Sequence, residues 1–190
     1  MHRQPLLKLL RQHRPVDPDE QAMTQATIDF VEQYPNCFDR SLLSGHITGS
    51  AWIVSPDRQQ TLLIHHRKLD RWLQPGGHAD GDPDVAAVAL REAQEETGLT
   101  TLTVVAPPGD NSNSDISQTV AILDVDIHPI PARNEVPEHL HYDIRFLVEA
   151  DPTEPLGFSD EINNIQWFTL ETASNYTDSE SIIRLIRKMK

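Results

Sequence analysis

The chain has 190 residues, of which 38% are hydrophobic and 24% are charged, as in a soluble globular protein with room for one domain and an appendage. Its 29 acidic and 16 basic residues give a formal net charge of −13, which argues against binding to nucleic-acid polymers or anionic membranes. Cys37 is the only cysteine, so no intrachain disulfide is expected. With no signal peptide and no apolar run of bilayer length, the sequence predicts a cytoplasmic protein.

Residues 1–40 predict a helical extension in front of a main domain at 41–190. A leucine-rich amphipathic helix breaks near Pro15, and Asp17 with Pro18 supplies the cap and the first-turn proline of a second helix. We expect these helices to cover an edge of the main domain. The alternatives that the sequence leaves open are a dimer contact, so that a homodimer is possible, or a lid over a binding site.

Two strands are expected next. The run GHITGSAWIV at 45–54 supplies apolar packing residues, and a second strand at 61–66 follows a turn at Pro56-Asp57. A basic cluster then contains Arg67 and Lys68, whose positive charge could meet phosphate oxygens. The equally weighted alternative is that these are ordinary solvated loop charges.

The stretch at 76–99, GGHADGDPDVAAVALREAQEETGL, predicts a loop that leads into a helix. Asp82 is the expected N-cap, with Pro83 at the first helical position and Asp84 in the first turn. Small apolar residues form one face of this helix, and Gly98 is placed to end it in a left-handed conformation.

The far half of this helix carries three carboxylates, Glu92, Glu95 and Glu96, which share a face because they are spaced i, i+3 and i+4. Carboxylates so close together repel one another. A hard divalent cation such as Mg²⁺ or Mn²⁺ relieves this repulsion because it takes oxygen ligands. The alternative is an ordinary acidic face on which Arg91 pairs with Glu95. The well-marked helix boundaries favour the cation site.

The rest of the chain continues the alternation of strands and loops. Further strands are expected around Leu102 to Val105, at 118–128, at 141–150 and at 162–170, and a capped helix from about Asp178 closes the chain. The turn-rich segment 107–117 predicts a mobile loop. Strands on both sides of one central helix, with another helix at the end, indicate an α/β fold with a mixed sheet between helical layers.

The stretch at 76–99 resembles the box of the Nudix hydrolase family, G-x5-E-x7-R-E-U-x-E-E-x-G-U, where U is a bulky aliphatic residue. Alignment on Arg91-Glu92 places Gly77 at the first position, Glu95-Glu96 at the double acid and Gly98-Leu99 at the close. Pro83 stands where the pattern has its first glutamate. The flanking runs at 72–77 and 165–168 also resemble those of Nudix domains.

This resemblance implies an α/β/α sandwich and a Mg²⁺- or Mn²⁺-dependent hydrolase. Such an enzyme would cleave a diphosphate linkage in a nucleoside diphosphate derivative or a similar small organic diphosphate. It implies that Glu92 and Glu96 are metal ligands, that Glu95 is a ligand or the catalytic base, and that the backbone carbonyl of Gly77 is a further ligand. With Pro83 offering no carboxylate, the part of the first box glutamate is either missing or taken by a neighbouring aspartate.

In this family a base can also come from a distant loop, which makes Glu161 a catalytic candidate alongside Glu95 and Glu96, with Glu135 and Glu138 as weaker ones. Substrate-binding candidates are Arg67, Lys68, His78 and Trp72; His78 follows the glycine pair directly, and Trp72 could stack on a base. Several histidines are present, but their spacing matches no closed zinc signature, and there is one cysteine.

Two alternatives to a hydrolase stay open. One is a diphosphate isomerase on the same fold, although no matching catalytic cysteine lies near the box and Cys37 is in the extension. The other is a catalytically weak ligand-binding or regulatory module, which the Pro83 departure makes conceivable. The intact Glu92, Glu95 and Glu96 argue against the second alternative.

Overall fold

Strand β1 (Gly45–Val54) lies at the centre of a mixed sheet in this structure, a computed structural model that describes residues 2–109, 120–133, 136–157, 162–177 and 179–190. β1 pairs antiparallel with β2 (Gln60–His66) and β4 (Gly76–His78), and parallel with β7 (His139–Glu149) along its whole length. Its bounds match the predicted first strand, and all of its residues are buried.

The remaining strands extend the sheet on either side of β1. β3 (Arg71–Leu73) and β8 (Ile162–Thr169) pair with β2, whereas β5 (Thr103–Val104) and β6 (Asp124–Ile130) pair with β7. These pairings are antiparallel, so the parallel β1–β7 pair makes the sheet mixed. The predicted α/β fold with a mixed sheet between helices is confirmed.

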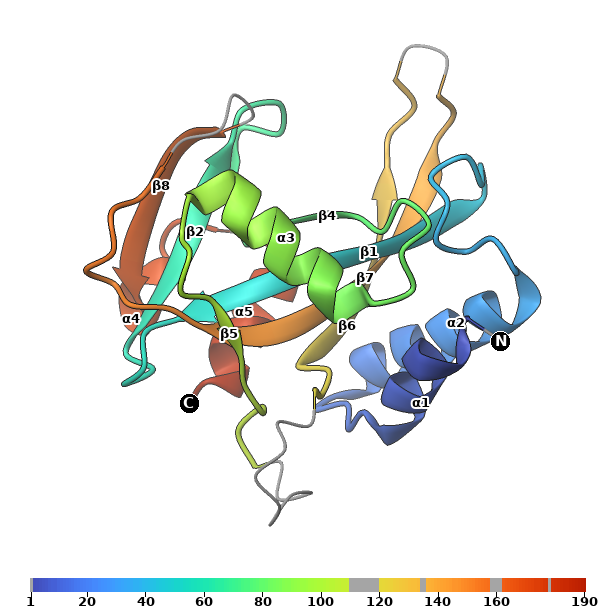
Figure 1. Ribbon diagram of the computed structural model, residues 1–190, viewed down its shortest axis with the longest axis horizontal. Coiled ribbons are helices and arrows are strands. Elements are labelled where there is room, and N and C mark those ends of the chain that lie inside the picture. The colour runs from blue at the N-terminus through green and yellow to red at the C-terminus, as the bar shows by residue number, and fades with distance from the viewer. Residues whose placement is uncertain (1, 110–119, 134–135, 158–161, 178) are drawn as a thin grey trace.

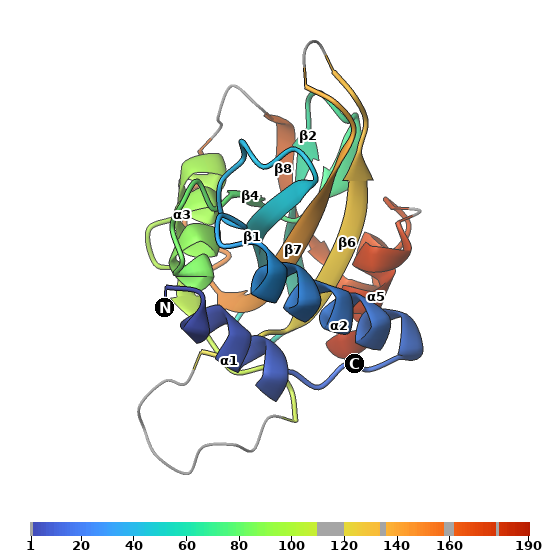
Figure 2. The ribbon, with the colours of Figure 1, turned by 90° about the vertical axis from the view of Figure 1, so that its right-hand side faces the viewer.

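Helix α3 (Val85–Thr97) covers one face of the curled sheet, and α5 (Glu180–Lys188) covers the other, after the short helix α4 (Leu170–Ala173) (Figure 1, Figure 2). Successive side chains of a strand point to opposite faces, and β1 follows this rule. Ala51 and Ile53 belong to the hydrophobic cluster beneath α3, and Trp52 belongs to the cluster beneath α5. No helix in the described part of the chain is long and apolar enough to cross a membrane.

The two predicted N-terminal helices are present as α1 (Gln4–Gln12) and α2 (Pro18–Gln33). The Asp17 side chain caps α2 by accepting a hydrogen bond from the Glu20 backbone N–H at 2.8 Å. Residues of both helices share one buried cluster with β1, β7 and α3, and the Phe30 ring stacks on Tyr142 at a centroid distance of 3.9 Å. The helices therefore cover the β6–β7 side of the sheet.

A buried charged network joins α2, the sheet and α5. Asp124 on β6 accepts hydrogen bonds from Arg145 at 3.2 Å and from Arg184 at 2.8 Å, and its carboxylate lies 2.9 Å from Lys188 Nζ. Lys188 also reaches Glu20, which His13 contacts as well. Burial alone would raise the pKa of Glu20, but these hydrogen bonds outweigh it and lower the pKa to about 2.

Several predicted boundaries were wrong. Helix α3 begins later than expected, because Asp84 is the N-cap and accepts from the Ala87 N–H at 3.1 Å, so Asp82 is not the cap. The strand predicted at 118–128 is displaced to Asp124–Ile130, where pairing with β7 sets its register. The short strands β3 and β4 were not predicted. The loop at 107–117 lies mostly outside the described residues, as does Asp178, and Ser179 is the N-cap of α5.

Candidate active site

Each of the three aspartates before α3 has a structural partner. Asp80 forms an ion pair with Arg40, which lowers the pKa of the Asp80 carboxyl. Asp82 accepts from the Asp84 N–H at 2.9 Å and lies 3.6 Å from Arg91, while Asp84 caps the helix. The hydrogen bonds of this acidic turn therefore determine where α3 begins. Asp84 caps the helix through a contact within the first turn, without help from distant residues.

Two box glutamates converge on the glycine pair of β4. Glu96 is 9% exposed, and its Oε2 accepts a hydrogen bond from the Gly76 backbone N–H at 3.0 Å. Glu92 packs directly over Gly77, since a Cβ added there would lie 2.2 Å from Glu92 Oε2. The glycine at position 77 is thus required by the close approach of a carboxylate, which also brings the Gly77 backbone next to Glu92.

The third glutamate, Glu95, is exposed on the same helix. Burial raises the pKa of Glu92, and the nearby charge of Glu95 raises it further, while Arg91 acts in the opposite direction. Arg91 lies 3.6 Å from Glu92 and from Asp82, and among the ion pairs of the described residues there is none between Arg91 and Glu95. Crowded carboxylates, one of them with a raised pKa, are a set of oxygen donors that fits a hard divalent cation.

Replacing Gly77 with alanine should lower activity by about 10- to 100-fold with little loss of stability, because a misplacement of about 1 Å in a catalytic group can cost that much. The clash is with the far end of the flexible Glu92 side chain, which can move away from its position at little cost to folding. Steady-state kinetics and thermal unfolding of the Gly77→Ala variant measure the two effects.

Gly109→Ala is the matched control for this prediction. A Cβ at Gly109 meets nothing within 4 Å, although its φ of 78° makes alanine strained by about 1 kcal/mol. This variant should lose a little stability and no activity. If Gly77→Ala retained full turnover, the position of Glu92 would not matter for the reaction.

The structure separates the other predicted site residues from one another. Arg67 donates to Asn163 Oδ1 at 3.2 Å and to the Ile162 carbonyl at 3.3 Å, which ties the β2–β3 turn to the start of β8. Lys68 is exposed in the same turn. Glu138 is exposed before β7, and Glu161 and Glu135 lie outside the described residues.

Just before the range 158–161, the Gly157 N–H donates to the Thr97 carbonyl at 2.7 Å. Gly157 therefore contacts the C-terminal end of α3 at Thr97, the residue after Glu96.

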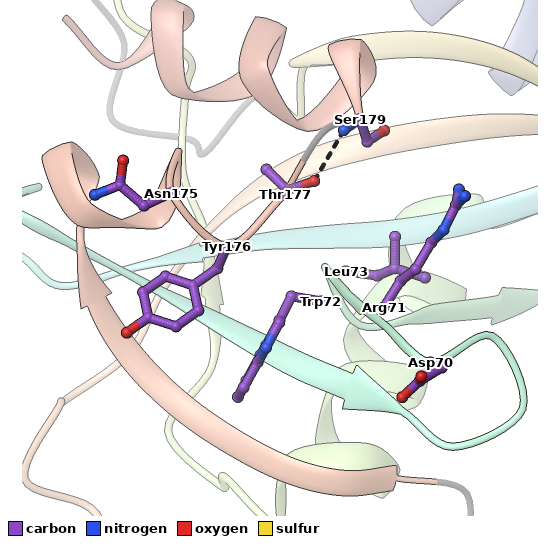
Figure 3. A pocket seen from close by; sticks show the side chains of 8 residues that line it. All are labelled: Asp70, Arg71, Trp72, Leu73, Asn175, Tyr176, Thr177 and Ser179. Atoms are coloured by element: carbon purple, nitrogen blue, oxygen red, sulfur yellow. Dashed lines mark hydrogen bonds between the residues drawn. The ribbon is translucent and has the colours of Figure 1, made fainter.

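Trp72 lines a pocket of about 470 Å³ between β3 and the segment that follows α4 (Figure 3). Its ring meets Phe168 edge-on at 5.0 Å and lies 6.2 Å from the ring of Tyr176, which is 50% exposed. One side of Trp72 is thus part of the core, and the pocket offers two aromatic rings together with Arg71.

His78 lies on the opposite side of β4 from Glu92. A Cβ at Gly77 would meet Glu92, whereas one at Gly76 would meet Ser50 on the other face of β1. Alternation then places the His78 side chain with Gly76, and its ring lies 5.0 Å from that of His46. His46 was not singled out from the sequence. The spacing of the histidines along the chain matches no zinc signature, so it did not predict that these side chains lie close together.

Comparison with known proteins agrees with this geometry. A family model described as NUDIX domain matches residues 46–189, which include α3 and its carboxylates. An Ap4A hydrolase from C. elegans in a binary complex has a TM-score of 0.53 at 21% identity, covering 75% of this chain and 93% of that one. A NUDIX-family hydrolase from Clostridium perfringens gives the same TM-score and identity, covering 76% and 95%.

The E. coli dihydroneopterin triphosphate pyrophosphohydrolase has a TM-score of 0.52 at 16% identity, covering 75% of this chain and 92% of that one. At these identities the structural likeness shows a shared fold. No curated protein sequence gives a significant match. Because the family model spans most of the chain, the chain belongs to the Nudix family. At the level of that family it is a pyrophosphohydrolase, as the sequence predicted.

Proposed function

We propose that this protein is a metal-dependent pyrophosphohydrolase that cleaves a diphosphate linkage in a nucleoside diphosphate derivative or a similar small organic diphosphate. The observation that carries the proposal is the convergence of Glu92 and Glu96 on the Gly76–Gly77 backbone, with Glu95 exposed beside them. Glu92, Glu96, Glu95 and the Gly77 carbonyl would hold Mg²⁺ or Mn²⁺. When bound, the cation supplies positive charge to the diphosphate oxygens and makes water a better nucleophile.

The side chains around the cation have distinct parts in this proposal. Glu96 accepts a hydrogen bond from the Gly76 N–H, and Glu92 lies 3.6 Å from Arg91, contacts that support a role as direct ligand for both carboxylates. Glu95 faces solvent, where it can be a ligand or can accept a proton from water. Glu161 is an alternative base.

The pocket at Trp72 and Tyr176 suits the group attached to the diphosphate. Aromatic rings stack on planar groups such as nucleobases, and Arg71 beside them can meet a phosphate oxygen. Arg67 and Lys68 lie in the β2–β3 turn that leads into the same pocket wall and are candidates for further phosphate contacts.

A substrate panel tests the proposal. The purified protein is incubated with nucleoside triphosphates, dinucleoside polyphosphates, nucleotide sugars and dihydroneopterin triphosphate, each with Mg²⁺, with Mn²⁺ or with a chelator. Release of phosphate, pyrophosphate or nucleoside monophosphate is measured. Hydrolysis of at least one compound that stops in the chelator supports the proposal, and no hydrolysis of any compound favours the binding module.

The isomerase alternative is weakened by the state of Cys37. The thiol is fully buried, and burial raises its pKa to about 11, so the reactive thiolate is scarce at neutral pH. Rearrangement of isopentenyl diphosphate without phosphate release would restore that alternative.

The same proposal includes a division of the chain into an N-terminal extension and a Nudix domain. Residues 1–40 would be a fixed covering extension of a Nudix domain at 41–190, because their leucines share its core. A cytoplasmic location and a homodimer belong to the proposal, and sedimentation analysis would test the oligomeric state.

A further inference from the structure

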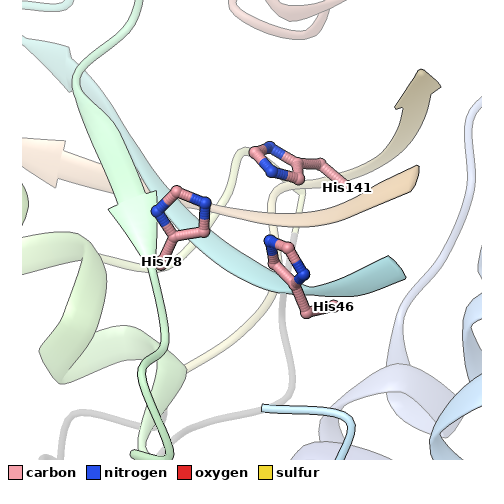
Figure 4. Close-up of side chains that lie close together, drawn as sticks. All are labelled: His46, His78 and His141. Atoms are coloured by element: carbon pink, nitrogen blue, oxygen red, sulfur yellow. The ribbon is translucent and has the colours of Figure 1, made fainter. Parts of the chain in front are cut away.

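Histidines from several strands meet on the face of the sheet away from α3. His46 on β1 is the register partner of His141 on β7, and His141 is the partner of His128 on β6. His78 on β4 lies beside them. Its register partner on β1 is Thr48, which is two residues after His46 and therefore on the same face of the strand. The rings of His46, His78 and His141 are 4.8 to 5.0 Å apart between centroids (Figure 4).

Ring nitrogens of His46 and His141 are buried without the hydrogen bonds that usually accompany burial. His46 is 2% exposed, and neither of its ring nitrogens has a well-aligned hydrogen-bond partner among the described residues, although the Leu42 backbone lies close enough to oppose the fall of its pKa. The buried Nε2 of His141 is in the same condition. Buried polar atoms in folded proteins are nearly always hydrogen-bonded, and a bound ion is one of the explanations for an exception.

The protonation state of the cluster suits a metal. Burial, followed by the charges of the neighbouring histidines, lowers the pKa of His46 to about 4 and that of His141 to about 2. Burial thus disfavours the charged form of both rings, and the neutral imidazole is the form that offers a lone pair to a metal ion.

The donor atoms are close enough to share one ion. One ring nitrogen from each of the three histidines lies within 4.8 Å of the other two. Three nitrogens on Zn²⁺ at about 2.0–2.1 Å would be separated by roughly 3.4 Å, so side-chain rotations must bring them somewhat closer. Two further histidines border the cluster, since the rings of His128 and His139 lie 5.5 and 5.4 Å from that of His141.

We propose that His46, His78 and His141 form a three-histidine site for a borderline divalent metal ion such as Zn²⁺ or Co²⁺, separate from the carboxylates of α3. Imidazole suits these ions, whereas Mg²⁺ prefers oxygen ligands, so the two sites select different metals. The site joins β4 to β1 and β7 directly after Gly77. Its occupancy would hold the strand that carries the glycine pair against the centre of the sheet.

Metal binding by the full-length, tag-free protein tests this site. After treatment with a chelator, the protein is titrated with Co²⁺ and its visible absorption is followed, and Zn²⁺ content is measured by elemental analysis. The expected result is about one tightly bound ion per chain, with the absorption of four- or five-coordinate Co²⁺. An excess of Zn²⁺ about 100-fold over Kd should also raise Tm by roughly 5–10 °C.

His78→Asn and His141→Asn should each abolish the Co²⁺ absorption and the Zn²⁺-dependent rise in Tm. The partly exposed His78 is the safer substitution for folding, and its Tm in chelator should equal that of the parent protein. His65→Asn on β2 is the matched control and should bind Zn²⁺ normally, as should Glu92→Gln. Absence of binding by the parent protein, binding that survives both cluster substitutions, or binding lost in Glu92→Gln would each overturn the proposal.

Discussion

Glu96→Gln is expected to lower turnover by about 10³-fold, equivalent to about 4 kcal/mol of the reaction barrier. The glutamine amide has nearly the same shape, and its oxygen can still accept the Gly76 N–H hydrogen bond that Glu96 accepts at 3.0 Å. What it loses is the negative charge, and a hard cation binds a neutral amide far more weakly than a carboxylate. The fold should therefore stay intact while the metal site fails.

Turnover of the best substrate from the panel, measured over a range of Mg²⁺ concentrations, checks this expectation. Glu180→Gln is the control, because Glu180 is exposed on α5 and pairs only at the surface with Arg187. That variant should turn over at the parent rate. Unchanged turnover in Glu96→Gln would mean that the carboxylate face of α3 does not carry the chemistry.

Arg184→Met is expected to lower the free energy of unfolding by about 3 kcal/mol. The Arg184 side chain is 5% exposed and lies 2.8 Å from Asp124 and 3.0 Å from Asp126. Removing one partner of a buried ion pair leaves charge without compensation in a poorly solvated place, which is why such changes cost about 3–5 kcal/mol. Arg145 still contacts both aspartates, so the loss should fall at the lower end.

Urea denaturation at neutral pH measures this loss, and Arg187→Met provides the comparison on the same helix. Arg187 is 55% exposed and pairs with Glu180, so its substitution should change stability by less than about 0.5 kcal/mol. Equal effects of the two substitutions would show that the buried network does not stabilise the fold.

The two strands that were not predicted share one physical cause. β3 and β4 span three residues each, which is too short for a two-residue alternation to stand out in a sequence. They are strands because β2 and β1 offer them hydrogen-bonding edges. In α5, Arg184 is buried more fully than Ile183, because β6 brings Asp124 and Asp126 to it.

The sequence alone determined the carboxylate face of α3. Glu92, Glu95 and Glu96 lie together because helical geometry acts over three and four residues, and no distant contact is needed to place them. Only the tertiary structure decided what surrounds that face. The meeting of Glu96 with Gly76 depends on how β4 pairs with β1, and the meeting of His46 with His141 depends on the parallel pairing of β1 with β7. Such pairings join residues far apart in the chain, so they cannot be predicted from the spacing of residues within one segment.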